Sequence, residues 1–402
     1  MIFELLALVL WLEQGLIEAA IYTWAYILCK ADLRLSRILL QKDRVKNTVV
    51  KAAQTILTEL ELNQRVWTPR TGDAWVSVDG RLHTHPTKAA QTVLKLVMSE
   101  RNRRGLENWK SRPMAGRVAV EPLVDQGLSY LWLEKGRTGW LAIRNAIGTQ
   151  EGTLNNRIKS AAPQNRLCRR CRHGVENEQH IVVGCPTFKN SLMLIRHNNV
   201  ARVLYYELCR KYGLRVPHHT QPITPVTENE KVKILYDVPV DVKHCMASLT
   251  NDNSRTVYAG VRCNRPDLVI FDKVQKAVTV VEVGVCWFSN LQRMEDIKYH
   301  KYATNSTVED ELELANPATV KTGPNLKGLM GEMYGKDYPK GVKVVPIVLG
   351  ASGEVKSNIV ARLKEMGFSK KKLIKELVTR MQLGVVVGTS LVIKAHLCCK
   401  PA

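Results

Sequence analysis

The sequence has few of the features that mark membrane, secreted or repetitive proteins. Its 402 residues contain no internal repeat and no low-complexity tract. The apolar segments near the N-terminus are Ile2 to Leu12 and Ile17 to Cys29. Glu4, Glu13 and Glu18 interrupt or separate them, so neither approaches the ~20 apolar residues of a membrane span. The first charge is acidic, whereas a signal peptide begins with basic residues. We expect two buried helices and no membrane partner; a membrane-associated segment is the alternative.

Acidic residues are scarce relative to basic ones. Lys and Arg number 59 against 37 Asp and Glu, which gives a formal charge of +22. Such a field attracts polyanions such as DNA without giving sequence preference. A basic surface that serves solubility is the alternative. Hydrophobic residues at 45% and charged residues at 24% are typical of globular proteins, so broad disorder is not expected.

Five of the ten cysteines stand alone. Single cysteines within apolar or strand-like stretches are typical of reduced, buried thiols, and here they are Cys29, Cys209, Cys245, Cys263 and Cys286. This favours a reducing compartment over a secreted disulfide framework. The expected compartment is therefore the cytosol or the nucleus.

The grouped cysteines predict a metal site. Cys168, Cys171, His180 and Cys185 have the spacing C-x2-C-x8-H-x4-C. Zinc prefers four sulfur or nitrogen donors in a closed tetrahedron, and a segment this small folds only with its metal. We therefore expect one structural zinc, although core cysteines grouped by chance would give the same letters. The predicted nucleic-acid contacts in and after this segment are Arg169, Arg170, Arg172, Arg196 and His197.

A second candidate site comes from a predicted hairpin. Two strand-like runs, 268–271 and 277–285, flank a short polar segment. With a four-residue loop, Asp267 faces Glu282. Opposed carboxylates repel each other unless a divalent cation binds both, and Glu282 within a run of valines is costly without a partner. We expect Asp267 and Glu282 to bind Mg²⁺ or Mn²⁺. A loop of three or five residues would instead place them on opposite faces.

A predicted helix follows the hairpin. From Asn290 to Tyr302 the pattern is helical, and Lys298, Lys301 and Tyr302 share one face at spacings of three and four. A lysine there can orient a water or stabilise charge on a phosphate. Solvated lysines are the alternative.

The whole sequence predicts an α/β fold, with helices first and a mixed sheet with flanking helices later. The expected segments are apolar and amphipathic helices (1–62), a helical linker region (63–160), a zinc knuckle (161–200), a mixed-sheet domain (201–350) and C-terminal helices (351–402).

The order of the motifs resembles a known family. After the knuckle come Arg-His-Asn (196–198), Tyr-Asp-Val-Pro (236–239), Arg-Pro-Asp (265–267), Val-Glu (281–282) and Lys-x-x-Lys-Tyr (298–302). This order, over about residues 150–390, resembles the C-terminal region of non-LTR retrotransposon polyproteins that carry a restriction-enzyme-like endonuclease. Such proteins nick one DNA strand and prime reverse transcription from the freed 3′ end.

The resemblance implies that residues 201–350 form a PD-(D/E)xK nuclease domain. Asp267 and Glu282 would be its metal-binding acids, acting on DNA and not on a small molecule, with element RNA as a further partner. Gly284 stands where such nucleases usually have lysine. In these elements a lysine on the following helix takes that place, which points to Lys298 or Lys301, with Tyr302 beside them.

One motif of the family is missing. Its reverse transcriptases carry a paired-aspartate motif, and no Asp-Asp occurs in this sequence. The chain therefore looks like a truncated copy or a partial gene product without the polymerase. We expect a metal-dependent DNA endonuclease with a zinc knuckle; a nucleic-acid-binding protein whose nuclease fold has lost catalysis is the alternative.

Overall fold

The computed structural model divides into two compact units, Met1–Arg112 and Pro113–Ala402. It describes residues 14–22, 24–25, 49–67, 76–112, 116–240, 265–303 and 326–398. The predicted apolar helices near the N-terminus therefore lie largely outside the described residues, although 14–22 are helical.

The first unit combines helices with a small antiparallel sheet of order β1-β2-β3. Its elements are α3 (Val49–Glu59), η1 (Leu62–Gln64), β1 (Val66–Trp67), β2 (Val76–Val78), β3 (Arg81–His83) and α4 (Pro86–Ser111). The region 63–160 was expected to be a helical linker. Its first part instead contains these three strands. Asp79 and Gly80, with φ of 49° and 78°, close a two-residue turn between β2 and β3, the turn type that Asp-Gly favours.

Basic residues on α4 have acidic partners within the first unit. Arg103 binds Glu100 and Glu107. Arg104 binds Glu100 and donates to the carbonyl of Leu60. The bond from Arg104 to Leu60 links α4 to the segment that follows α3.

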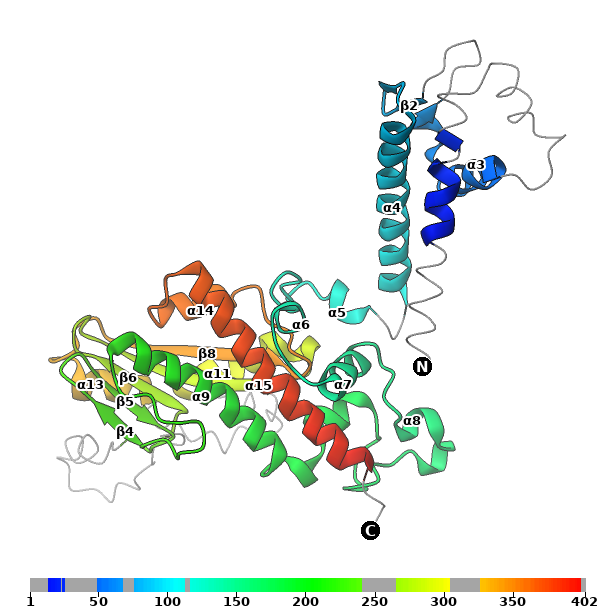
Figure 1. Cartoon of the computed structure of the whole chain (residues 1–402). Coiled ribbons are helices and arrows are strands. Elements are labelled where there is room, and N and C mark those ends of the chain that lie inside the picture. The colour runs from blue at the N-terminus through cyan, green and yellow to red at the C-terminus, as the bar shows by residue number, and fades with distance from the viewer. Residues whose placement is uncertain are drawn as a thin grey trace, which may run out of the picture. The chain divides into compact units, whose positions relative to one another are not determined.

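The second unit is a mixed α/β fold, as predicted (Figure 1). Its helices are α5 (Arg117–Val120), α6 (Leu131–Glu134), α7 (Trp140–Gln150), α8 (Arg157–Ser160), α9 (Leu192–Tyr212), α11 (Leu291–Ala303), α13 (Leu326–Tyr334), α14 (Ile359–Glu365) and α15 (Lys371–Cys398). Short helical turns are η2 (Pro163–Asn165), η3 (His180–Gly184), η4 (Pro186–Phe188) and η5 (Phe288–Asn290). The strands are β4 (Val226–Glu228), β5 (Val232–Tyr236), β6 (Leu268–Asp272), β7 (Ala277–Cys286) and β8 (Val342–Gly350).

These strands form one sheet of order β4-β5-β6-β7-β8. Strands β4 to β7 pair antiparallel, and β8 pairs parallel with β7. In the β6–β7 hairpin, Asp272 pairs with Ala277 and Leu268 with Val281. This is the register predicted from a four-residue loop.

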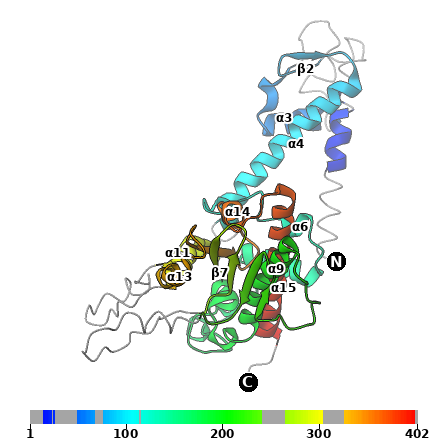
Figure 2. The ribbon, with the colours of Figure 1, turned by 90° about the vertical axis from the view of Figure 1, so that its left-hand side faces the viewer.

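Both faces of the sheet are covered, because alternate side chains enter different cores. Leu268 and Ile270 pack with residues of α9, α14 and α15, whereas Val269 and Phe271 pack with residues of α11 and α13. Figure 2 shows α11 and α13 on one side of β7 and α9 and α15 on the other.

Helix α15 packs along α9 at a close crossing. A Cβ atom added at Gly388 would lie 2.6 Å from Cβ of Arg196, so only glycine permits this approach. Among the described residues, Lys371–Leu397 is long and apolar enough to cross a membrane, but 67% of its most apolar window is buried inside the protein. A core helix has the same properties.

The expected segments after residue 112 share one core rather than forming separate bodies. One cluster joins residues from Leu131 through α9 and the sheet to Val385. Within 351–402, where C-terminal helices were expected, the described residues form α14 and α15.

Candidate functional site

The two predicted acids lie side by side on neighbouring strands. Asp267 immediately precedes β6, and Glu282 lies within β7 on the α11 face of the sheet. The backbone N–H of Asp267 donates to Glu282 Oε2 at 3.3 Å. Glu282 is only 2% exposed, as its valine-rich strand indicates.

Hydrogen bonds fix both oxygens of the Asp267 carboxylate. The backbone N–H of Val283 donates to Oδ2 at 2.6 Å. Nε2 of His197, on α9, lies 2.8 Å from Oδ1. Burial raises the pKa of Asp267, but His197, the Val283 N–H and the charge of Lys298 more than offset this, and the pKa lies below its usual value.

Glu282 is held by the predicted helix. The ammonium groups of Lys298 and Lys301 both lie 2.8 Å from its Oε1. The hydroxyl of Tyr302, which is fully buried, lies 3.1 Å from Oε2 and 3.0 Å from the carbonyl of Arg265. Two carboxylates and two ammonium groups thus meet in one place, and both candidate lysines reach the acid.

Glycine at position 284 is explained by packing. A Cβ atom there would lie 3.0 Å from Cγ of Met294 on α11 and 3.2 Å from a methyl of Val348. Helix α11 therefore takes the space that a side chain at 284 would need. A side chain at 284 would require Met294 or Val348 to shift by a few tenths of an ångström.

A buried ion cluster anchors α11. Glu295 is 4% exposed; it binds Lys356, accepts from Asn358 at 2.8 Å and binds Arg362 of α14 at 2.7 Å. Burial raises the pKa of Glu295, but Lys356 and Arg362 lower it to below its usual value. This cluster fixes the helix one turn before Lys298.

The knuckle folds through a tight loop. The N–H of Cys168 donates to the carbonyl of Gly174 at 2.7 Å. Arg172 has a φ of 58°, a left-handed conformation, and its N–H donates to the carbonyl of Cys168 at 3.0 Å, which closes the loop. A side chain at Gly174 would lie 2.9 Å from Nδ1 of His180. Glycine there leaves room for that imidazole.

The donors converge, with one addition. Cys168, His180, Cys185 and His396 place their donor atoms within 4.8 Å of one another and can hold a metal ion. Cys171, the remaining predicted ligand, has its sulfur 3.4 Å from Nε2 of His180. His396, near the end of α15, lies 3.2 Å from the sulfur of Cys168 and was not predicted.

The donor chemistry fits a cation. Ligands ~2.0–2.3 Å from zinc in a tetrahedron are about 3.3–3.8 Å apart, close to the 3.9 Å between the sulfurs of Cys168 and Cys185. Burial lowers the pKa of His396 to about 4 and also lowers that of His180, so both imidazoles are neutral and able to coordinate. Burial raises the pKa of the Cys185 thiol to about 11, and a bound cation would remove that proton.

Three arginines predicted to contact nucleic acid have internal partners. Arg169 binds the fully buried Glu176 at 2.6 Å. Arg170 donates to the carbonyls of Ala395 and His396 at 2.6 and 3.2 Å. Arg196 is 2% exposed and donates to Val182 and Thr389. The expectation that Arg196 contacts a phosphate is therefore corrected, because its side chain is buried. Arg169 and Arg170 remain partly exposed, and their contact with nucleic acid stays a prediction.

The other two residues predicted to contact nucleic acid are Arg172 and His197, and their surroundings differ from those of the three arginines. Arg172 is exposed. His197 is bonded to Asp267, so it belongs to the acidic site.

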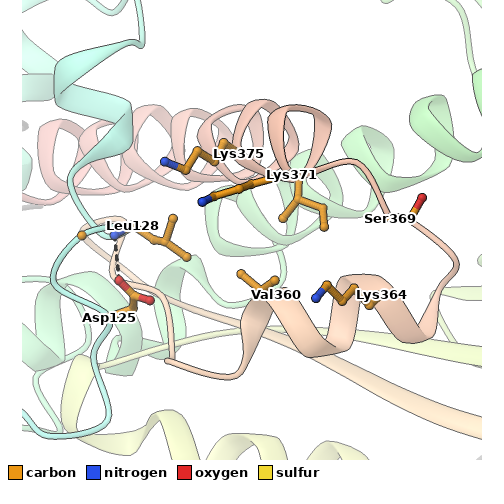
Figure 3. A pocket seen from close by; sticks show the side chains of 9 residues that line it. Asp125, Leu128, Val360, Lys364, Ser369, Lys371 and Lys375 are labelled. Carbon is orange, nitrogen blue, oxygen red and sulfur yellow. Dashed lines mark hydrogen bonds between the residues drawn. The ribbon is translucent and has the colours of Figure 1, made fainter.

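A basic cavity of about 480 Å³ lies between α14, the start of α15 and the loop at 125–128 (Figure 3). Apolar side chains of Leu128, Val360 and Ile374 line it, together with Lys364, Lys371 and Lys375. No ion pair is found for these lysines within the described part of the chain. The sequence predicted C-terminal helices in this segment and did not predict a cavity.

No model of a known protein family matches this chain, and no curated protein matches it either.

Proposed function

We propose that the chain is a metal-dependent DNA endonuclease that nicks one strand at the site of Asp267 and Glu282. The observation that carries this proposal is that two carboxylates share one face with Lys298 and Lys301. Magnesium is commonly bound by one or two carboxylates together with substrate phosphates. The mixed sheet with these acids on adjacent strands supports a restriction-enzyme-like PD-(D/E)xK domain.

Each side chain has a role that follows from its contacts. Asp267 and Glu282 hold the cation, and Tyr302 keeps Glu282 in place. A bound Mg²⁺ or Mn²⁺ supplies positive charge that polarises the phosphate and acidifies water. Water attacks phosphorus and the P–O3′ bond breaks, which leaves a 3′-hydroxyl and a 5′-phosphate.

The lysines balance charge before and during the reaction. Lys298 and Lys301 neutralise the two acids in the absence of a cation. With a cation held by the acids, the ammonium groups of Lys298 and Lys301 would be free to orient water and to stabilise the phosphate. The site then carries net positive charge, which complements its substrate.

The knuckle is proposed to hold one structural zinc. Sulfur and imidazole donors suit zinc, and Cys168 and Cys185 are buried as closed sites require. The order of the motifs supports an origin in a non-LTR retrotransposon polyprotein, with nuclear DNA as target and element RNA as a second partner.

The test is strand nicking by the full chain. Zinc-loaded protein should convert supercoiled plasmid to open circles with Mg²⁺ or Mn²⁺ and not with EDTA. Asp267→Asn and Glu282→Gln should each reduce the rate at least about 1000-fold. Asp296→Asn, an acid on α11 bonded to Gln292, serves as the control and should keep the wild-type rate.

Folded wild-type protein that binds DNA but never nicks it would contradict the proposal. That result would favour the alternative, a nucleic-acid-binding protein that has lost catalysis.

A further inference from the structure

The contacts of His197 separate it from the other basic residues near the knuckle. Its side chain is 21% exposed, and Nε2 lies 2.8 Å from Oδ1 of Asp267. The other Asp267 oxygen is held by the Val283 N–H. Two donors from two elements, α9 and β7, therefore fix the rotation of this carboxylate.

The neighbouring residue fixes α9 itself at this point. Arg196 is buried and donates to the carbonyl of Val182, in the turn that carries His180, and to Thr389 of α15. Arg196 thus binds the turn before α9 and helix α15, whereas His197, the next residue, binds the acidic site. Because Arg196 leaves the helix little freedom, the imidazole of His197 is held where Asp267 needs it.

We propose that His197 is a positioning residue for the cation site, donating Nε2–H to Asp267 Oδ1 so that the carboxylate faces Glu282 before the cation arrives. This rests on the proposed function, in which Asp267 is a metal ligand. A carboxylate oxygen has two lone pairs, so Oδ1 of Asp267 can accept from His197 with one and bind the cation with the other. Outer-shell partners of this kind typically change metal affinity or activity by about 10–100-fold.

The decisive variants differ only in the donor. His197→Phe keeps a ring and removes the N–H, whereas His197→Gln keeps an amide N–H at a similar reach. His219→Phe, on an exposed loop residue, is the matched control. Binding of Mn²⁺ alone to zinc-loaded full chain is measured by calorimetry, with Asp267→Asn identifying the heat that belongs to this site.

We expect His197→Phe to weaken Asp267-dependent Mn²⁺ binding by about 10-fold or more, and to raise the Mg²⁺ concentration for half-maximal nicking by a similar factor. His197→Gln should recover most of both, and His219→Phe should match wild type. A merely structural role would lower the melting temperature and the rate without moving the half-saturating concentration.

Equal Mn²⁺ affinity in wild type and His197→Phe would overturn the proposal, as would a Gln variant no better than Phe. Absence of any Asp267-dependent Mn²⁺ binding in the wild type would overturn it too. Mn²⁺ binding that depends on His197, without nicking by the wild type, would support the positioning role and reject the nuclease.

Discussion

The knuckle and the acidic site gather their side chains by different means. The knuckle draws Cys168, His180 and Cys185 from one short segment and closes them off, with both cysteines buried. The acidic site joins Asp267 and Glu282 across a hairpin and leaves Lys298 and Lys301 partly exposed, at 19% and 29% of their side-chain surface. A closed set of donors suits a structural metal, whereas an open one leaves room for substrate.

The comparison implies that damage to the knuckle affects folding and damage to the acids affects activity. The largest effect is therefore expected for Cys168→Ser. Bound zinc, measured by mass spectrometry, should fall from one per chain to nearly none, because a thiolate ligand is lost. Amide exchange across residues 166–185 should accelerate at least ~100-fold. Glu282→Gln, the matched change in the other site, should keep zinc and protection.

A measurement of zinc affinity decides which residue completes the knuckle. Cys171→Ser and His396→Ala should be compared for zinc affinity by competition with a chelator. The variant with the greater loss of zinc affinity identifies the fourth ligand. The variant with the smaller loss, about 10–100-fold, identifies the residue that contacts a ligand without binding the metal. Full zinc occupancy after removing both Cys168 and Cys171 would contradict this site.

A smaller effect should appear where the acidic site depends on distant packing. Glu295→Gln removes the anion of Lys356 and the buried one of the two acidic partners of Arg362, and breaking a buried ion pair costs about 3 kcal/mol. Chemical denaturation should show this loss, together with slower nicking because α11 carries both lysines. Glu365→Gln, which removes an exposed partner of Arg362, should cost less than about 0.5 kcal/mol.

This cluster also gives a pH dependence of stability. The pKa of Glu295 is lowered in the folded state, so its stabilisation is present above the unfolded value of about 4.3 and is lost as pH falls through the folded pKa. Wild type should therefore lose stability more steeply than Glu295→Gln below about pH 4. Parallel curves for the two proteins would argue against an ionised Glu295.

The smallest effect concerns DNA contacts outside both sites. Replacing Lys364, Lys371 and Lys375 by Gln should flatten the dependence of affinity on salt by at most about 2.7 in the logarithmic slope, since each phosphate contact contributes about 0.9. The control replaces three exposed lysines that do not line this cavity, Lys231, Lys336 and Lys343. If both triple variants change the slope equally, the basic cavity of Figure 3 is not a distinct DNA contact.

The sequence predicted what depends on local spacing. The hairpin register follows from loop length and alternation, and it placed Asp267 opposite Glu282. The face shared by Lys298, Lys301 and Tyr302 follows from helical periodicity. Both arguments hold because strand and helix periods are fixed by backbone geometry.

Contacts between distant segments could not be predicted in this way. His396 reaches Cys168 across 228 positions of the chain, and no local pattern connects them. Arg169, Arg170 and Arg196 look like surface charges until their buried partners are known. The Asp79-Gly80 pair, in contrast, is a local signal for a hairpin in the first unit, and the sequence interpretation missed it.

The meeting of Cys168 and His396 has a consequence for synthesis on the ribosome. Translation proceeds at ~5–20 residues per second, so His396 is added on the order of ten to fifty seconds after Cys168. During that interval the nascent knuckle has its local cysteines but not the helix that covers them. Release of the C-terminal segment, rather than availability of metal alone, would then set the time at which this part of the protein reaches its final structure.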